Sequence, residues 1–345
     1  MKILHILSSH IFSGAENVVC QIINMYKDQA GVEMAYCSPD GTIRSALEER
    51  GITFYPLESM SKSAVKAVID EYQPDLVHAH DMRASLFAAL ACGNLPLVSH
   101  VHTNAADARG LSPKSIAYLY PGLKARDIIW VSNSALKGYA FKGLLQKKST
   151  VLYNVEDPEI LNAKMALDTT DYDFDIVFIG RMVYAKNIQK LLRILRIACD
   201  TKPDLKAAVV GTGEEEAEIK ALCTKLGLDN NVSFLGYQSN PFKILHDSKI
   251  MVMTSRFEGT PMVALEAIAF GVPIVSTPTD GMVDLIEDGV NGYLTDDEPE
   301  FAKHLLDILS DESLRQSLIE NQKKLSNAVN NVDNYKRTLD KIYRF

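Results

Sequence analysis

Residues 250–277, IMVMTSRFEGTPMVALEAIAFGVPIVST, have the pattern of one complete β–α–β unit. The apolar run Ile250–Thr254 predicts a buried strand, and the loop after it contains Gly259 and Pro261. A helix is expected to begin near Met262, and a second short apolar run follows at residues 274–277. Units of this kind build parallel sheets that are covered by helices on both faces.

The same alternation continues on both sides of this unit. Further strands are predicted where apolar runs end at Gly, Ser, Asp or Pro, with segments of helical period between them: KILHILSS (2–9), VEMAYCS (32–38), DLVHAH (75–80), PLVSHVHT (96–103), DIVFIG (175–180) and LKAAVVGTG (205–213). The pattern pauses in the polar, acidic stretch VEDPEILNAKMALDTTDYD at residues 155–173.

We therefore predict an α/β protein with two doubly wound, Rossmann-like domains that face a central cleft. The first domain covers residues 1–155, residues 156–172 form a linker, and the second domain covers residues 173–325. Residues 326–345 are expected to form a C-terminal helix that can cross back to the first domain. Ligands of open α/β sheets bind at the carboxyl ends of the strands, so functional residues are expected there.

Composition excludes several classes of protein. The chain has 345 residues, 47% of them hydrophobic, and a formal net charge of -8, so it lacks the basic footprint of a general nucleic-acid binder. Its five cysteines are scattered without a CxxC pair, which indicates buried thiols in a reducing compartment. No apolar run reaches the roughly 18 residues of a membrane-spanning helix. A cytoplasmic protein is expected.

The loop and helix at residues 255–271 carry the most informative polar groups. The backbone amides of residues 259–263 can face an anion, with the positive end of the helix behind them. Glu258 precedes this helix, and Glu266 lies inside it among apolar neighbours, where an unpaired carboxylate is costly to bury. Glu266 therefore either binds a ligand or forms a structural hydrogen bond to nearby backbone, and both interpretations stay open.

Two further loops contain groups suited to phosphate. In FIGRMVYAKN, Arg181 and Lys186 occupy a strand–loop–helix connection, where they either grip a diphosphate or are ordinary surface charges. In FSGAEN, Gly14 begins a helix whose free amides can face a phosphate. This loop is not GxGxxG, and no acidic residue ends the second strand to hold a ribose, which disfavours a nicotinamide dehydrogenase.

Histidines gather at the ends of two predicted strands, His78 and His80 on one and His100 and His102 on the other. Residues two apart on a strand share a face, so a four-histidine metal site is geometrically possible. No carboxylate or cysteine pattern accompanies these residues, and we expect no metal there. His102 is expected to meet substrate hydroxyls instead.

These motifs together resemble a known family. Glu258-x7-Glu266, joined in order to FIGRMVYAKN, VVGTG, GVPIVST and GVNGYL, is similar to the retaining glycosyltransferases of family 4, which have the GT-B fold. The resemblance covers nearly the whole chain and is strongest from Ile176 to Leu294. It implies an enzyme that moves a sugar from a nucleotide diphospho-sugar, a UDP-sugar above all, to an acceptor hydroxyl with retention of anomeric configuration.

The resemblance also implies roles at the matching positions. Glu266 would bind the ribose hydroxyls, Glu258 the sugar hydroxyls, and Arg181 with Lys186 would neutralise the leaving diphosphate. Backbone contacts to the sugar and phosphates would come from Gly259, Thr260, Pro261, Met262 and Val263, and the first domain would add Gly14 at the diphosphate and His102 at the donor sugar. Neither a metal nor a separate cofactor is expected, because the cations and helix amides stabilise the leaving anion.

The acceptor is expected to contact the first domain. Residues 109–148 are locally basic, and their cations face only Asp127: Arg109, Lys114, Lys124, Arg126, Lys137, Lys142, Lys147 and Lys148. This segment is either a solvated face or a surface for an anionic partner. The second interpretation favours a carbohydrate or lipid-linked acceptor at the inner face of a membrane, as in bacterial surface polysaccharide or glycolipid assembly.

Two other functions remain open from the sequence. The same fold hosts nucleotide-sugar epimerases, which would interconvert the donor sugar without an acceptor. A non-catalytic nucleotide-sugar-binding protein would bind the donor without turnover. The presence of Glu258, Glu266, Arg181 and Lys186 favours an active transferase over this last possibility.

Overall fold

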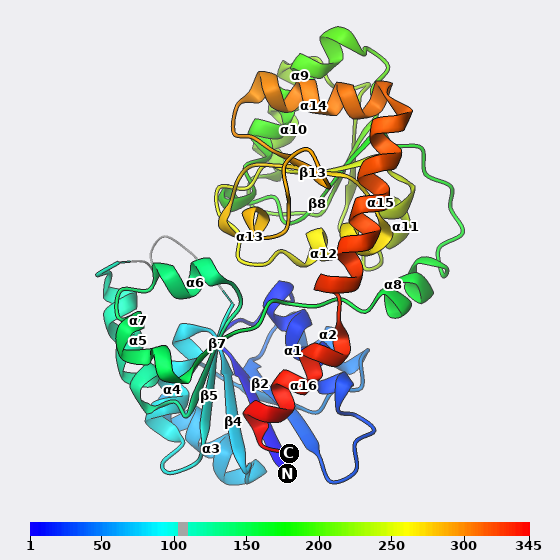
Figure 1. Cartoon of the computed structure of the whole chain (residues 1–345). Helices are drawn as coiled ribbons and strands as arrows, with labels where there is room; N and C mark the ends of the chain where they lie inside the picture. The colour runs from blue at the N-terminus through cyan, green and yellow to red at the C-terminus, as the bar shows by residue number, and fades with distance from the viewer. Residues whose placement is uncertain (103–109) are drawn as a thin grey trace. The chain divides into compact units, whose positions relative to one another are not determined.

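The computed structural model describes residues 1–102 and 110–345, which form two compact units (Figure 1). The first unit contains residues Met1–Asn154 and Asp333–Phe345, and the second contains Val155–Val332. Each unit is built around one parallel sheet, as the alternating pattern predicts. The chain therefore contains two Rossmann-like domains.

The first unit has a seven-stranded sheet in the order β3-β2-β1-β4-β5-β6-β7, and all its strand pairs are parallel. The strands are β1 (Lys2–Leu7), β2 (Glu33–Pro39), β3 (Phe54–Leu57), β4 (Leu76–His80), β5 (Leu97–Val101), β6 (Asp127–Trp130) and β7 (Ser149–Val151). The strand order reverses between β1 and β4, and such a reversal leaves a crevice at the carboxyl ends of the strands.

Helices cover this sheet on both faces. The described helices of the first unit are α1 (Gly14–Met25), α2 (Ile43–Glu48), α3 (Lys62–Tyr72), α4 (Met82–Ala91), α5 (Pro113–Lys124), α6 (Asn133–Gly138), α7 (Lys142–Leu145), η2 (Gln146–Lys148) and α16 (Val332–Tyr343). Leu4, Val77 and Ala79 point to the core under α3 and α4. The residues between them on the strands point to the opposite face, where Tyr343 of α16 packs against Tyr26.

The second unit has a six-stranded parallel sheet in the order β10-β9-β8-β11-β12-β13, which reverses between β8 and β11. Its strands are β8 (Ile176–Ile179), β9 (Ala207–Val210), β10 (Val232–Gly236), β11 (Ile250–Met253), β12 (Ile274–Ser276) and β13 (Gly292–Leu294). Its helices are α8 (Pro158–Met165), η3 (Tyr184–Lys186), α9 (Ile188–Thr201), α10 (Glu216–Lys225), α11 (Phe242–Asp247), α12 (Met262–Phe270), α13 (Asp280–Val283), α14 (Glu298–Ser310) and α15 (Glu312–Val329). Two apolar clusters, one on each face of the sheet, form its core.

The boundaries differ from the expected ones in two places. Residues 156–172 do not form a free linker, because Asp157 caps helix α8, whose Leu161 is buried, and the segment belongs to the second unit. The second unit also extends through α15 to Val332, beyond the expected end at residue 325. Residues Asp333–Phe345 belong to the first unit.

The sequence analysis also led to expectations for the cysteines and for membrane-spanning helices. All five cysteines are buried and free, as the sequence predicts. Across residues 1–102 and 110–345, none of the helices has the length and apolar character that crossing a bilayer requires.

Candidate functional site

The best candidate site lies at the point where the strand order of the second sheet reverses. Strands β8 and β11 are neighbours there, with Ile250 beside Ile176, and their carboxyl ends lead into the two loops that sequence patterns single out. The β8 loop carries Arg181 and Lys186, and the β11 loop carries Glu258. Ligands of doubly wound sheets bind at this position, so topology alone brings these residues to one site.

Lys186 and Glu258 form an ion pair within this site. Lys186 Nζ donates to Glu258 Oε1 at 2.5 Å, and Ser255 Oγ donates to the same oxygen at 2.6 Å. The exposed fractions of the two charged side chains are only 22% and 11%. The pair is therefore partly shielded from water, and two donors fix the orientation of the Glu258 carboxylate.

Arg181 differs from Lys186, because its side chain is exposed and no acidic partner holds it within the described chain. The backbone beneath it is tightly packed. A Cβ added at Gly180 would lie 3.6 Å from Lys186 Cε, so the lysine side chain runs beside the start of the Arg181 loop. The two predicted cations thus lie on the same loop, where Lys186 is paired and Arg181 is exposed.

Two glycines of the VVGTG motif support this loop. A Cβ at Gly211 would lie 2.1 Å from the carbonyl oxygen of Gly180, and one at Gly213 would lie 2.3 Å from that of Met182. The amide of Met182 also donates to the carbonyl of Thr212 at 2.9 Å. The two glycines therefore let two loops touch through their backbones.

The predicted anion-binding loop begins helix α12. Pro261 occupies the N-cap position, and no side chain caps the helix, so the amides of Met262 and Val263 lie in an uncapped first turn. Gly259 is held from the opposite loop, because a Cβ added at Gly281 would clash with its carbonyl oxygen at 1.4 Å. Thr260 is buried at 5% exposure. The five predicted residues 259–263 are therefore in one rigid turn at a helix N-terminus.

Glu266 lies one turn further along α12. It is half-buried, and burial followed by the neighbouring Glu156 carboxylate raises its pKa to about 8, while Lys164 opposes the shift. The Glu156 amide donates to Asn330 Oδ1, and Asn330 Nδ2 donates to the carbonyl of Leu265, so the backbone of Glu156 is tied to the same helix. Within the described chain no backbone group bonds the Glu266 carboxylate, which disfavours the structural interpretation.

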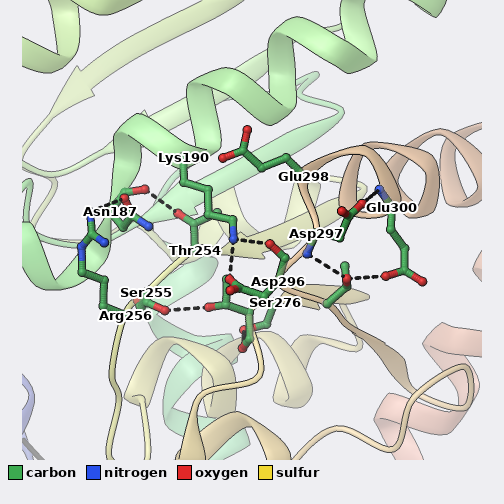
Figure 2. Close-up of polar contacts among 12 residues, drawn as sticks. Asn187, Lys190, Thr254, Ser255, Arg256, Ser276, Asp296, Asp297, Glu298 and Glu300 are labelled. Carbon is green, nitrogen blue, oxygen red and sulfur yellow. Dashed lines mark hydrogen bonds and ion pairs between the residues drawn. The ribbon is translucent and has the colours of Figure 1, made fainter. Parts of the chain in front are cut away.

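A polar pocket of about 750 Å³ lies beside α9, and its lining includes Ser255, which donates to Glu258. Figure 2 shows polar contacts of the lining residues Asn187, Lys190, Arg256 and Asp296. Lys190 of α9 points across the pocket and bonds to the Asp296 carboxylate and carbonyl, and Arg256 Nη2 donates to Asn187 Oδ1 at 2.9 Å. Arg193 forms an ion pair with Glu298 at 2.7 Å. Lys190 and Arg193 therefore fasten α9 to the β13–α14 connection.

The first unit contains the remaining predicted residues. Gly14 is the first residue of α1, where it is exposed, and the buried Glu16 occupies the same first turn. Burial raises the pKa of Glu16, and a hydrogen bond from Ser13 opposes the shift. A carboxyl group at this helix N-terminus competes with a phosphate for the positive end of the dipole, which the sequence analysis did not consider.

His102 follows β5, and its Nε2 lies 2.9 Å from His80 Nδ1. Burial lowers the pKa of His102 to about 3, so its ring is neutral at physiological pH. Residues 103–109, including Arg109 of the basic segment, lie outside the described residues.

The sequence analysis did not name Asp81 as a polar residue at the carboxyl end of a strand. It follows β4 at the point where the first sheet reverses, and it has a φ of 117°, which is unusual for a residue other than glycine. Its carboxylate accepts from the amide and hydroxyl of Ser8, at 3.0 and 2.8 Å, and from the amide of Ala84 at 2.7 Å. The signal was available in sequence, as an acid directly after the strand DLVHAH.

Comparisons with known proteins give two family matches that together span most of the chain. Residues 12–159 match the family model described as Glycosyltransferase Family 4, and residues 162–325 match Glycosyl transferases group 1. The chain belongs to family 4 of the glycosyltransferases. The predicted membership of family 4 and the predicted GT-B fold are thereby confirmed.

Individual relatives are more distant. This glycosyltransferase is 26% identical to the lipopolysaccharide 1,6-galactosyltransferase of Escherichia coli K12, over 82% of this chain and 81% of that one. It is 32% identical to the N-acetylgalactosamine-N,N'-diacetylbacillosaminyl-diphospho-undecaprenol 4-alpha-N-acetylgalactosaminyltransferase of Campylobacter jejuni, over 50% of this chain and 47% of that one. The structure of HepE of Anabaena in complex with UDP-glucose has the same fold, with a TM-score of 0.87, 22% identity and coverage of 100% and 99%.

Proposed function

We propose that this glycosyltransferase transfers a hexose from a UDP-sugar to a lipid-linked saccharide, with retention of anomeric configuration and without a catalytic metal. The observation that carries the proposal is the β8–β11 reversal, where the β8 loop carries Arg181 and Lys186 and the β11 loop leads into the uncapped first turn of α12. Two cations and free helix amides are what a diphosphate leaving group requires. The fold shared with HepE, solved with UDP-glucose, supports UDP as the nucleotide.

The remaining donor contacts follow from the same geometry. Glu266, one turn into α12, is half-buried, and its carboxyl group has no hydrogen-bond partner among the described residues. It is proposed to bind the ribose hydroxyls. Glu258, oriented by Lys186 and Ser255, is proposed to bind sugar hydroxyls through its second oxygen. Gly14 and His102 of the first unit stay predicted contacts of the diphosphate and the sugar.

The chemistry requires stabilisation of the leaving group. As the bond from the anomeric carbon to the phosphate oxygen breaks, positive charge develops on the sugar and negative charge on the diphosphate. Arg181, Lys186 and the α12 amides stabilise that anion, which is typically the largest catalytic effect. The Lys186 ammonium has three N–H donors, so it can donate to the diphosphate while it stays paired with Glu258.

Retention is proposed from the resemblance to the retaining enzymes of family 4. Same-face attack is proposed in place of a covalent glycosyl-enzyme, because the described site offers no carboxylate placed as a nucleophile: Glu258 is held by two donors, and Glu266 lies deeper in the helix. The acceptor hydroxyl attacks from the face that the diphosphate leaves, and its proton passes to the leaving phosphate oxygen. NMR of the early product is expected to show the donor's anomeric configuration, and an inverted centre would contradict the mechanism.

The acceptor surface is proposed to lie on α5 and α7, where exposed apolar and basic residues combine. Ile116, Tyr120 and Leu123 form a stripe along α5 at helical spacing, with exposed fractions of 54%, 47% and 53%. Leu144 of α7, exposed to 64%, lies near them because α5 packs on α7 through Gly122 and Leu145. An apolar stripe flanked by lysines is typical of a helix that lies in the interface of an anionic membrane.

A ligand panel tests the donor assignment. Melting temperatures are measured with UDP-, GDP-, ADP- and CMP-sugars, with and without EDTA, for the wild type and for Arg181→Ala. A ligand at a hundred times its dissociation constant stabilises a protein by about 2.7 kcal/mol, so a clear shift with the UDP-sugars alone is expected, unaffected by EDTA and lost in Arg181→Ala.

Arg193→Ala is the matched control, since Arg193 is 46% exposed and already pairs with Glu298. A shift lost equally in both variants would contradict the role of Arg181. A shift caused by another nucleotide class would overturn the assignment of UDP. Interconversion of the donor sugar without an acceptor would identify an epimerase instead.

A further inference from the structure

The first unit contains a cluster of five histidines that the proposed transferase function does not require as a whole. The register of the sheet brings the rings together: His5 of β1 lies beside His78 of β4, and His80 of β4 lies beside His100 of β5. His102 follows at the end of β5. All project to the sheet face opposite the core formed with α3 and α4, because their strand neighbours Leu4, Val77 and Ala79 belong to that core.

The rings are close and buried. His5, His78, His80 and His100 have exposed fractions of 0%. The ring centroids of His78 and His80 lie 3.9 Å apart, and those of His5 lie 5.1 Å from His78 and 5.2 Å from His80. His5 Nδ1 lies 2.9 Å from His80 Nε2.

Several of these ring nitrogens have no partner among the described residues. They are Nε2 of His5, Nε2 of His78, both nitrogens of His100 and Nδ1 of His102. A buried polar atom without a partner loses its hydration and gains nothing in return, so such atoms are rare in folded proteins. Two of these five atoms lie on His5 and His78, and no described protein group satisfies them.

We propose that His5, His78 and His80 form a binding site for a first-row transition-metal ion of the Zn²⁺ class. One nitrogen from each of these rings lies within 4.8 Å of the other two. Zinc binds imidazole nitrogen at about 2.0–2.1 Å, which places ligand atoms roughly 3.3 Å apart, so modest ring rotations bring the three to bonding distance. An ion between His5 and His80 replaces the hydrogen bond that now joins them.

The surroundings of His78 fit a metal ligand. Its Nδ1 lies 2.8 Å from the hydroxyl of Tyr343 on α16, while its Nε2 is the nitrogen without a partner. A metal-binding imidazole commonly uses one nitrogen for the ion and donates the other N–H to a fixed acceptor, which orients the ring. Tyr343 is therefore a positioning residue for this site.

The ligand chemistry selects the class of ion. Three neutral imidazoles suit zinc, cobalt, nickel or copper, whereas magnesium and calcium require oxygen ligands. No carboxylate or thiol joins this group of ligand atoms in the described chain. We therefore expect Co²⁺ and Zn²⁺ to bind and Mg²⁺ not to bind.

The test uses the full chain, stripped with a chelator and dialysed. After addition of Zn²⁺ or Co²⁺ and removal of free metal, elemental analysis is expected to find one ion per chain, and Co²⁺ is expected to give the visible absorption of a low-coordinate nitrogen site. Zn²⁺ should also raise the melting temperature, and Mg²⁺ should not. His78→Gln is expected to lose the ion but to keep its melting shift with UDP-sugar, which separates this proposal from that of the donor site.

Two further variants keep the test decisive if His78→Gln does not fold. Tyr343→Phe removes only the hydroxyl beside His78 and is expected to weaken binding about tenfold. His246→Gln changes the exposed imidazole that pairs with Asp247 and is expected to bind as the wild type does. Folded wild-type protein that takes up no ion would overturn the proposal, as would an ion lost in His246→Gln but kept in Tyr343→Phe with unchanged affinity.

Discussion

At the scale of single residues, the site shows how the same type of side chain acquires different properties. Glu258 is held by Lys186 and Ser255, whereas Glu266 lies eight residues later beside another carboxylate. Sequence spacing identified both residues. It could not show the Lys186 partner, which is 72 positions away, or the Glu156 partner, because both contacts exist only in the folded chain.

The raised pKa of Glu266 predicts a pH dependence of stability. The unfolded chain loses this proton near the ordinary pKa of 4.5, but the folded chain loses it only near 8. Ionisation therefore costs folding free energy, and stability falls as pH rises through this window. Glu266→Gln removes the effect, so its melting temperature relative to wild type should rise between pH 5 and about pH 8.

The exposed Glu71→Gln serves as control, and its difference from wild type is expected to stay flat over the same pH range. A flat difference for Glu266→Gln as well would show that the carboxyl group titrates normally. At every pH the variant is also expected to lose most of its melting shift with UDP-sugar.

At the scale of elements, the strands and most helices were predictable, because apolar runs and helical periods alternate clearly. The prediction of a linker at residues 156–172 was wrong. The polar composition of this segment gives no sign of helix α8, which has Asp157 at its N-cap and begins at Pro158. Composition alone does not show that Leu161 is buried in the second unit.

The contact of the β8 and β9 loops predicts a strong effect of one methyl group. Gly211→Ala places Cβ 2.1 Å from the Gly180 carbonyl and also strains a φ of +130°. We expect a loss of about 3 kcal/mol in the free energy of unfolding, measured by urea denaturation, and weaker UDP-sugar binding because the Arg181 loop moves. Gly227→Ala is the control, since its φ is +68° and its Cβ meets nothing within 4 Å.

Gly227→Ala should lose only about 1 kcal/mol, the cost of the left-handed conformation itself. Equal losses in the two variants would show that backbone strain, and not the contact between the loops, limits position 211.

At the scale of the whole molecule, the two family matches and the two parallel sheets agree with the predicted architecture. The sequence could not show which cations of the basic segment, residues 109–148, bond to groups within the protein. Lys148 Nζ donates to the carbonyls of Leu123 and Ala125, and Arg126 bonds to Asp127 and to the carbonyl of Ile342. These two cations support the fold, whereas Lys142 and Lys147 are exposed.

The membrane surface is tested with those exposed lysines. Lys142→Glu combined with Lys147→Glu is expected to reduce sedimentation with anionic liposomes several-fold at low salt, and the difference should shrink as salt screens the charges. Leu123→Ser should weaken binding at all salt concentrations, because its contribution is apolar. Lys225→Glu combined with Lys303→Glu, on the second unit, makes the same charge change and should leave binding as it is. Equal losses in both double variants would show that only net charge matters.

The return of residues 333–345 to the first unit has a consequence for biosynthesis. Tyr343 covers His78 and packs on Tyr26, whose hydroxyl also bonds to Asp340, so residues from both ends of the chain close one side of the first sheet. A nascent chain that has emerged only as far as residue 154 holds every strand of that sheet but leaves these rings uncovered. The first sheet therefore receives its last covering element only after the whole second unit has been synthesised.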